Sequence, residues 1–143
     1  MTCTFLGHRD TPSSVEPILR SILIDLIENQ NVSLFYLGNQ GNFDRIAQRV
    51  LLQLKENYSY IRFFIVLAYR PSLKNCSDKD NNTIYPEVLE TTPLKYAISK
   101  RNQWMIDHSD FVVTYIRYTT GGAATSQKIA EKKGKKIIKL SDF

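Results

Sequence analysis

The segment that decides the predicted fold is FVVTYIRYTTGGAATSQKIAEKKGKKIIKL, residues 111–140. It opens with an apolar, β-branched run at 111–116, which is typical of a strand buried on both faces. The glycine pair Gly121-Gly122 then opens a helix that we expect to run through Lys133, where Gly134 ends it. A second β-branched run at 136–140 completes a β-α-β unit, whose two strands should be parallel.

The same alternation recurs towards the amino terminus. Further strands are predicted at 2–6, 32–37 and 61–69, and further helices at about 15–27, around the apolar positions 46–54 and at about 94–108. Residues 70–92 are irregular and predict a long loop. The alternation predicts a single α/β domain over residues 1–143, with a Rossmann-like three-layer sandwich and a mainly parallel five-stranded sheet.

Composition limits the classes of partner. Lys and Arg exceed Asp and Glu by five, and the sequence pI of about 9.2 favours anionic partners. The two cysteines, Cys3 and Cys76, have no metal-ligand or redox spacing, so we expect reduced thiols and no metal or other cofactor. No apolar run approaches the roughly 20 residues that span a bilayer, and no signal peptide is recognisable. We therefore expect a cytoplasmic protein with no membrane contact.

Three strand-end loops are the candidate binding region. In parallel sheets, ligands bind beyond the carboxyl ends of the strands, so the loops at 7–10, 38–42 and 119–125 should converge. The glycine pair at 121–122 would bare the first amides of a helix, an arrangement that suits a phosphate. A plain turn with a helix cap remains the alternative for these glycines.

Short motifs give this region a family resemblance. The stretch 100–113 followed by 120–125 resembles the SLOG superfamily, Rossmann-like domains for nucleotides and nucleotide-derived ligands that include the LOG-type phosphoribohydrolases. The matching residues are Arg101, Met105, His108, Ser109, Asp110, Gly121, Gly122 and Thr125. Residues 5–9 and 38–44 look more like the small YpsA-type branch.

Departures from the LOG-type pattern bear on activity. Thr120 and Ala124 replace a proline and a glycine, and Lys128 occupies the position of the glutamate that takes part in hydrolysis. A lysine cannot stabilise an oxocarbenium-like centre or activate water as a carboxylate does, but it would attract a phosphate. The resemblance therefore favours binding over the known hydrolysis.

Three functions follow as hypotheses. The leading one is binding of a nucleotide or nucleotide-derived phosphate ligand, with a role as a sensor, and a homodimer is left open. The candidate ligand-binding residues are Gly7, His8, Arg9, Gly38, Asn39, Gln40, Arg101, Thr120, Gly121, Gly122, Ala123, Thr125 and Lys128. An alternative is a nucleotide N-glycosidase that uses Arg101 with a displaced carboxylate, Glu87 or Asp44.

The third hypothesis is binding of single-stranded nucleic acid, because DNA processing protein A is a SLOG member that holds single strands. The lysines cluster near one helix end, however, and do not form a groove interleaved with aromatic residues. Of the three hypotheses, the sequence therefore favours binding of nucleic acid least.

Overall fold

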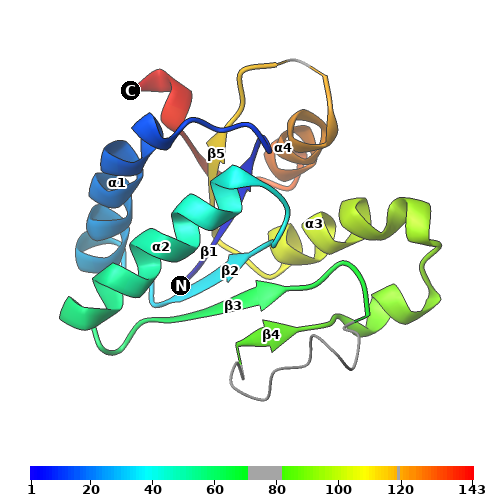
Figure 1. The fold of residues 1–143 in the computed structure, drawn as a ribbon, viewed down its shortest axis with the longest axis horizontal. Coiled ribbons are helices and arrows are strands. Elements are labelled where there is room, and N and C mark those ends of the chain that lie inside the picture. Colours follow the sequence, from blue (N-terminus) through cyan, green and yellow to red (C-terminus); the bar gives the residue numbers. More distant parts are fainter. Residues whose placement is uncertain (71–81, 119) are drawn as a thin grey trace.

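The computed structural model describes residues 1–70, 82–118 and 120–143. Strands and helices alternate along most of the chain, and β4 follows β3 without a described helix between them (Figure 1). The strands are β1 (Thr2–Gly7), β2 (Leu34–Leu37), β3 (Arg62–Val66), β4 (Thr83–Ile84), β5 (Phe111–Tyr115) and β6 (Lys136–Lys139). The α-helices are α1 (Glu16–Asn29), α2 (Asn42–Asn57), α3 (Ala97–Asp107) and α4 (Gly122–Lys132), and the 3-10 turns are η1 (Ser13–Val15), η2 (Glu87–Thr91), η3 (Leu94–Tyr96) and η4 (Leu140–Asp142).

The strands form one parallel sheet of order β4-β3-β2-β1-β5-β6. The chain winds outward from β1 to β4 on one side and then returns to β5 and β6 on the other. The order therefore reverses between β1 and β5, and such a switch point opens a crevice at the carboxyl ends of the strands. The predicted α/β class and parallel sheet are confirmed.

The predicted strand number, five, is wrong by one. The additional strand, β4, lies within the segment 70–92 that the sequence indicates as a loop, and it pairs with the end of β3 through Ile65↔Thr83 and Val66↔Ile84. Two residues are too few to show the alternation by which a strand is recognised in a sequence. Residues 71–81 of that predicted loop lie outside the described residues, as does Cys76.

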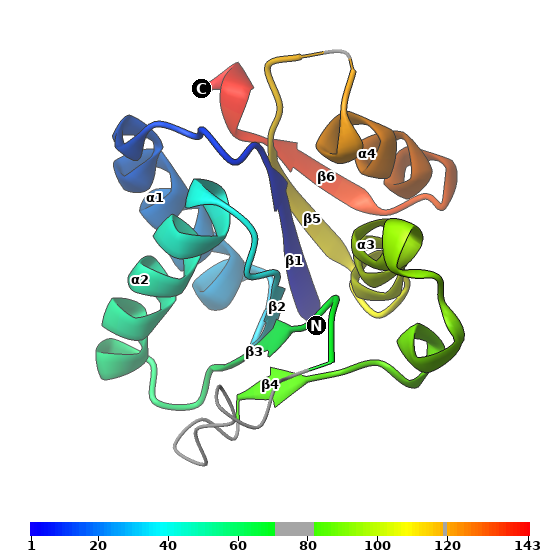
Figure 2. The ribbon, with the colours of Figure 1, turned by 45° about the vertical axis from the view of Figure 1, so that its right-hand side comes forward.

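The four α-helices form two layers, and the apolar core beneath one layer is larger than the core beneath the other. Helices α1 and α2 pack on one face of the sheet, and α3 and α4 pack on the other (Figure 2). Neighbouring residues of β1 serve the two faces, because side chains alternate along a strand. Phe5 belongs to the large cluster beneath α1 and α2, and Leu6 belongs to a cluster of four buried residues with Ile106, Val112 and Ala130 beneath α3 and α4. Most of the apolar core therefore lies on the α1/α2 side.

Several boundaries are shifted from the predicted ones. The helix expected over 94–108 begins as the turn η3, and α3 follows it from Ala97. Gly41 and Gly121 precede α2 and α4 with φ of 98° and 108°, a backbone region that favours glycine. The Cys3 thiol is buried and free, and burial raises its pKa. No helix in the described part of the chain is long and apolar enough to cross a membrane.

Candidate functional site

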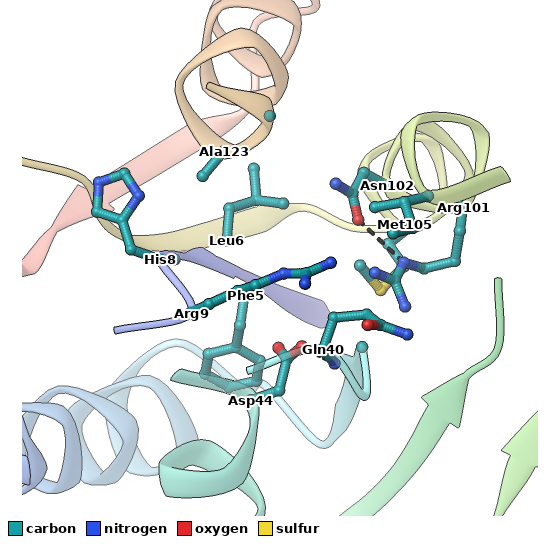
Figure 3. A pocket seen from close by; sticks show the side chains of 14 residues that line it. Phe5, Leu6, His8, Arg9, Gln40, Asp44, Arg101, Asn102, Met105 and Ala123 are labelled. Carbon is teal, nitrogen blue, oxygen red and sulfur yellow. Dashed lines mark hydrogen bonds between the residues drawn. The ribbon is translucent and has the colours of Figure 1, made fainter. Parts of the chain in front are cut away.

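A pocket of about 320 Å³ opens at the carboxyl ends of β1 and β2, beside the switch in strand order (Figure 3). It is lined by the ends of these strands, by one face of α3 and by the start of α4. The lining residues are Phe5, Leu6, Gly7, His8, Arg9, Gly38, Gln40, Asp44, Ile98, Arg101, Asn102, Met105, Gly122 and Ala123. Loops far apart in the sequence therefore meet at this rim, as the parallel sheet requires.

Arg101 is the most deeply placed cation of the pocket. Its side chain comes from α3 and the residue is only 2% exposed. Nη1 donates to the Val66 carbonyl at 3.0 Å, and Nε donates to Asn102 Oδ1 at 3.0 Å. Burial lowers the pKa of Arg101, and the nearby Asp44 opposes that shift. An arginine stays charged at neutral pH even so, and here it is held by hydrogen bonds in a defined position.

Asp44 supplies the opposite charge from the first turn of α2. Its Oδ2 accepts the Gln40 backbone N–H at 2.9 Å, which fixes the loop between β2 and α2. Loss of solvent raises the pKa of Asp44, while the Gln40 and Gly38 amides and the Arg101 charge lower it in part. Removal from water therefore outweighs the favourable contacts, and the ionised carboxylate is kept at some cost in stability.

Gly38 lets these two charged side chains approach the same stretch of backbone. A Cβ added at Gly38 would lie 2.8 Å from Arg101 Nη1 and 2.8 Å from Asp44 Oδ2. Gly41 has a related role at the edge of the pocket, where an added Cβ would meet Arg9 Cα at 2.5 Å. At Gly41 the close atom belongs to the backbone, so glycine is required there, whereas a Cβ at Gly38 would displace the ends of two side chains.

His8 connects this pocket to a second one. His8 Nε2 accepts the Arg117 backbone N–H at 2.9 Å, and the His8 and Tyr118 rings lie 4.7 Å apart between centroids. A second pocket of about 370 Å³ begins at that point. It is lined by Ile116, Arg117, Tyr118, Ala124, Gln127, Lys128 and Glu131. The two pockets are therefore neighbours along the rim, with His8 and Tyr118 at their boundary.

The structure places the sequence-predicted residues in three groups. The first pocket brings together Gly7, His8, Arg9, Gly38, Gln40, Arg101, Gly122 and Ala123, together with the proposed carboxylate Asp44. Lys128 lines the second pocket. Asn39, Thr120, Gly121 and Thr125 line neither of them, and the exposed Glu87 lies apart in η2. The Thr125 hydroxyl donates to the Gly121 carbonyl at 3.0 Å and so completes the first turn of α4.

Several pocket residues are absent from the predicted set. They are Phe5, Leu6, Ile98, Asn102 and Met105. Asn102 is buried and ties α3 to α4, because its Nδ2 donates to Ser126 Oγ at 3.3 Å. Positions 98, 101, 102 and 105 recur at helical spacing and so lie on one face of a helix. That spacing is a signal that could have grouped Ile98, Asn102 and Met105 with Arg101. In the sequence, Met105 belongs to the SLOG-like motif but is not among the candidate ligand-binding residues.

Comparison with known proteins gives matches of fold only. No family model and no curated protein matches this chain. Among solved structures, DNA processing protein A (DprA) from Streptococcus pneumoniae matches with a TM-score of 0.69 and 15% identity, over 96% of this chain and 49% of that one. DprA from Helicobacter pylori matches with a TM-score of 0.68 and 17% identity, over 97% of this chain and 64% of that one, and its structure concerns a single-stranded DNA binding mode. The chain therefore spans less than two thirds of each matched protein.

These matches support a Rossmann-like α/β fold, and membership of the SLOG superfamily and of its YpsA-type branch stays a prediction. They contradict the leading prediction of a nucleotide-ligand sensor, because both matched proteins process DNA and one is described by its binding of single strands. The expectation that nucleic acid is the least expected partner is wrong for the same reason. It relied on the position of the lysines along the sequence, which does not show that Lys128 lines the same pocket as Arg117 and the exposed Tyr118.

Proposed function

We propose that this chain binds single-stranded DNA along the rim formed by the carboxyl ends of β1 and β5. The observation that carries the proposal is the likeness of fold, over 96% or more of this chain, to two DNA processing proteins, one of them described as binding single strands. At 15% and 17% identity the likeness concerns the fold, so the argument for binding also draws on the surface of this chain.

The rim presents positive charge to solvent. Arg9, Arg117 and Lys128 are all exposed and line the two neighbouring pockets. Most of the affinity of a protein for a single strand comes from Lys and Arg side chains that neutralise its phosphates and release the counterions bound to them. Three cations spaced along two adjoining pockets can follow a strand backbone, and the formal net charge of +5 would favour its approach.

The rim also presents an aromatic face next to these cations. Tyr118 is 55% exposed, and its ring packs on His8 where the two pockets meet. Bases stack on such rings without regard to sequence, at roughly 1–3 kcal/mol per base. The combination of Tyr118 with Arg117 and Lys128 supplies the mixture of aromatic and basic side chains that single-strand binding requires.

Salt dependence tests the proposal. A labelled oligo(dT) titrated by fluorescence anisotropy should bind with a log–log salt slope of about −2, if three phosphates are neutralised at roughly −0.7 each. The affinity should then fall about 20-fold between 50 and 200 mM salt. Arg117→Gln and Lys128→Gln should each make the slope shallower by about 0.7. The hydrogen bond from residue 117 to His8 involves the backbone N–H, so the first variant can keep it.

Lys55→Gln is the matched control, because it removes the same charge from the exposed last turn of α2, at the opposite end of the sheet. Its slope should equal that of the wild type. The proposal is refuted if the wild type does not bind oligo(dT) at 50 mM salt, or if all three variants change the slope equally.

A further inference from the structure

The deep end of the first pocket carries groups of opposite hydrogen-bonding type. Arg101 can only donate and an ionised Asp44 can only accept, and both lie against Gly38. Figure 3 shows Arg9 and Arg101 reaching into the pocket from different elements, with Asp44 beside Gln40. A phosphate offers acceptors alone and would leave the carboxylate without a donor. This end of the pocket therefore suits an uncharged group that has donors and acceptors side by side.

Both charged side chains have atoms available for such a group. Within the described part of the chain, Arg101 uses Nη1 and Nε for hydrogen bonds, while Nη2 makes none. Asp44 receives the backbone amides of Gln40 and Gly38, and no side chain of the described residues donates a hydrogen bond to it. Arg101 Nη2 is not among the buried side-chain atoms that lack a partner in the described residues, so it is accessible from the pocket. It can therefore donate to an acceptor of a ligand bound there.

We propose that this pocket holds one unstacked guanine base of the bound strand, an inference that rests on the proposed function. Guanine presents the acceptors O6 and N7, which an arginine commonly contacts with two hydrogen bonds. Its N1–H and N2–H₂ groups lie next to O6 and match a carboxylate. Adenine and cytosine offer a single exocyclic amine on the corresponding edge, and thymine offers a single N–H between two carbonyls, so none of them satisfies both side chains equally.

The remaining walls and the size of the pocket fit a single base. Phe5, Leu6 and Met105 are buried apolar residues that line it, so they can cover the faces of a ring. A volume of about 320 Å³ is at the small end of the range for ligand pockets. Neighbouring nucleotides would then remain on the rim, near Tyr118 and its cations.

The test compares oligo(dT) strands that carry one central substitution. The strands contain guanine, inosine, adenine, cytosine or thymine at that position, and anisotropy titrations at one salt concentration give their affinities for the wild-type protein. The guanine strand should bind roughly 10-fold more tightly than the all-thymine strand, as expected when one base pairs well with its side chains. Inosine lacks the N2 amine and should lose part of that advantage.

Asp44→Asn separates recognition from general electrostatics. Loss of a negative charge should strengthen binding of every strand, whereas the ratio of guanine to thymine affinity should fall to about 2-fold or less. An asparagine can still accept the Gln40 amide, so the loop can keep its hydrogen bond. Asp25→Asn makes the same change of charge on the exposed surface of α1 and should leave the ratio unchanged.

The outcomes distinguish this inference from the proposed function. Equal binding of all five strands, or a preference for another base, would overturn the guanine site while leaving single-strand binding intact. A guanine preference that survives Asp44→Asn would also overturn it. If none of the strands binds at all, the proposed function and the guanine site are both wrong.

Discussion

Replacement of Gly38 by alanine should displace the Arg101 and Asp44 side chains in the pocket without creating backbone strain. Gly38 is not among the glycines with positive φ, so alanine can adopt its backbone conformation. The new Cβ, however, would lie 2.8 Å from Arg101 Nη1 and 2.8 Å from Asp44 Oδ2, whereas ordinary contact begins at 3.4 Å. Each atom must therefore retreat by about 0.6 Å.

The expected loss of unfolding free energy follows from the hydrogen bond that Arg101 makes to Val66. Nη1 donates to the Val66 carbonyl at 3.0 Å, and a retreat of that size would stretch the bond beyond useful hydrogen-bond length. A hydrogen bond from a charged donor contributes about 1.5–3 kcal/mol. Alanine restricts the unfolded chain and returns roughly 0.4–1 kcal/mol. The net loss of unfolding free energy should be about 1–2 kcal/mol, or roughly 3–8 °C in Tm for a chain of this length.

Thermal unfolding followed by circular dichroism measures this difference, and Gly122→Ala is the matched control. Gly122 lines the same pocket, its φ is not positive, and an added Cβ there meets nothing within 4 Å. That variant should melt at the wild-type temperature or slightly above. If Gly38→Ala melts as high as Gly122→Ala, Arg101 is not held as we describe, and the reasoning from its hydrogen bond fails.

Three further predictions concern stability. Gly7→Ala would place a Cβ 2.3 Å from ring carbons of Phe43, which is 1% exposed, so its Tm should fall further than that of Gly38→Ala; an unchanged Tm would contradict this packing. Thr114→Val removes a buried hydroxyl that has no hydrogen-bond partner among the described residues, so the free energy of unfolding should rise by roughly 1 kcal/mol. Thr4→Val breaks a 3.0 Å hydrogen bond to a β2 carbonyl and should lower it by a similar amount, so chemical denaturation should give the two variants changes of opposite sign. Because burial raises the pKa of Asp44, its folded form binds a proton more readily than its unfolded form, so its contribution to stability should fall as pH rises from about 4 through the raised pKa. Tm values of wild type and Asp44→Asn should therefore diverge with increasing pH in favour of the variant, and parallel curves would refute the shift.

The sequence was sufficient for the architecture because its signals are local. Apolar runs such as 111–116 and glycines such as Gly134 mark the strands and the helix ends directly. The two-residue strand β4 has no such signal, because its pairing depends on the position of β3 in space. The convergence of the three rim loops was also predictable, since it follows from parallel strands alone.

The interior of the pocket was harder to predict than its rim. The sequence could not show whether Arg101 is solvated or buried, because that depends on how α3 packs beside Val66 and Asn102. The glycine pair had suggested a phosphate site centred on the start of α4. In the structure only Gly122 of that pair lines the pocket, and the deepest charged groups come from α2 and α3.

The uneven distribution of the core has a consequence for how such a chain can evolve. In the described part of the chain, most buried apolar residues serve the α1/α2 layer, while the clusters beside α3 and α4 are small, with four residues around Leu6 and three that include Ala97. Helices α3 and α4 are also joined through Asn102 and Ser126. Substitutions in the α3/α4 layer thus place less of the folding free energy at risk. Mutation can remodel those walls of the pocket that α3 and α4 supply while the α1/α2 layer preserves the fold, a division of roles that allows one architecture to acquire new specificities.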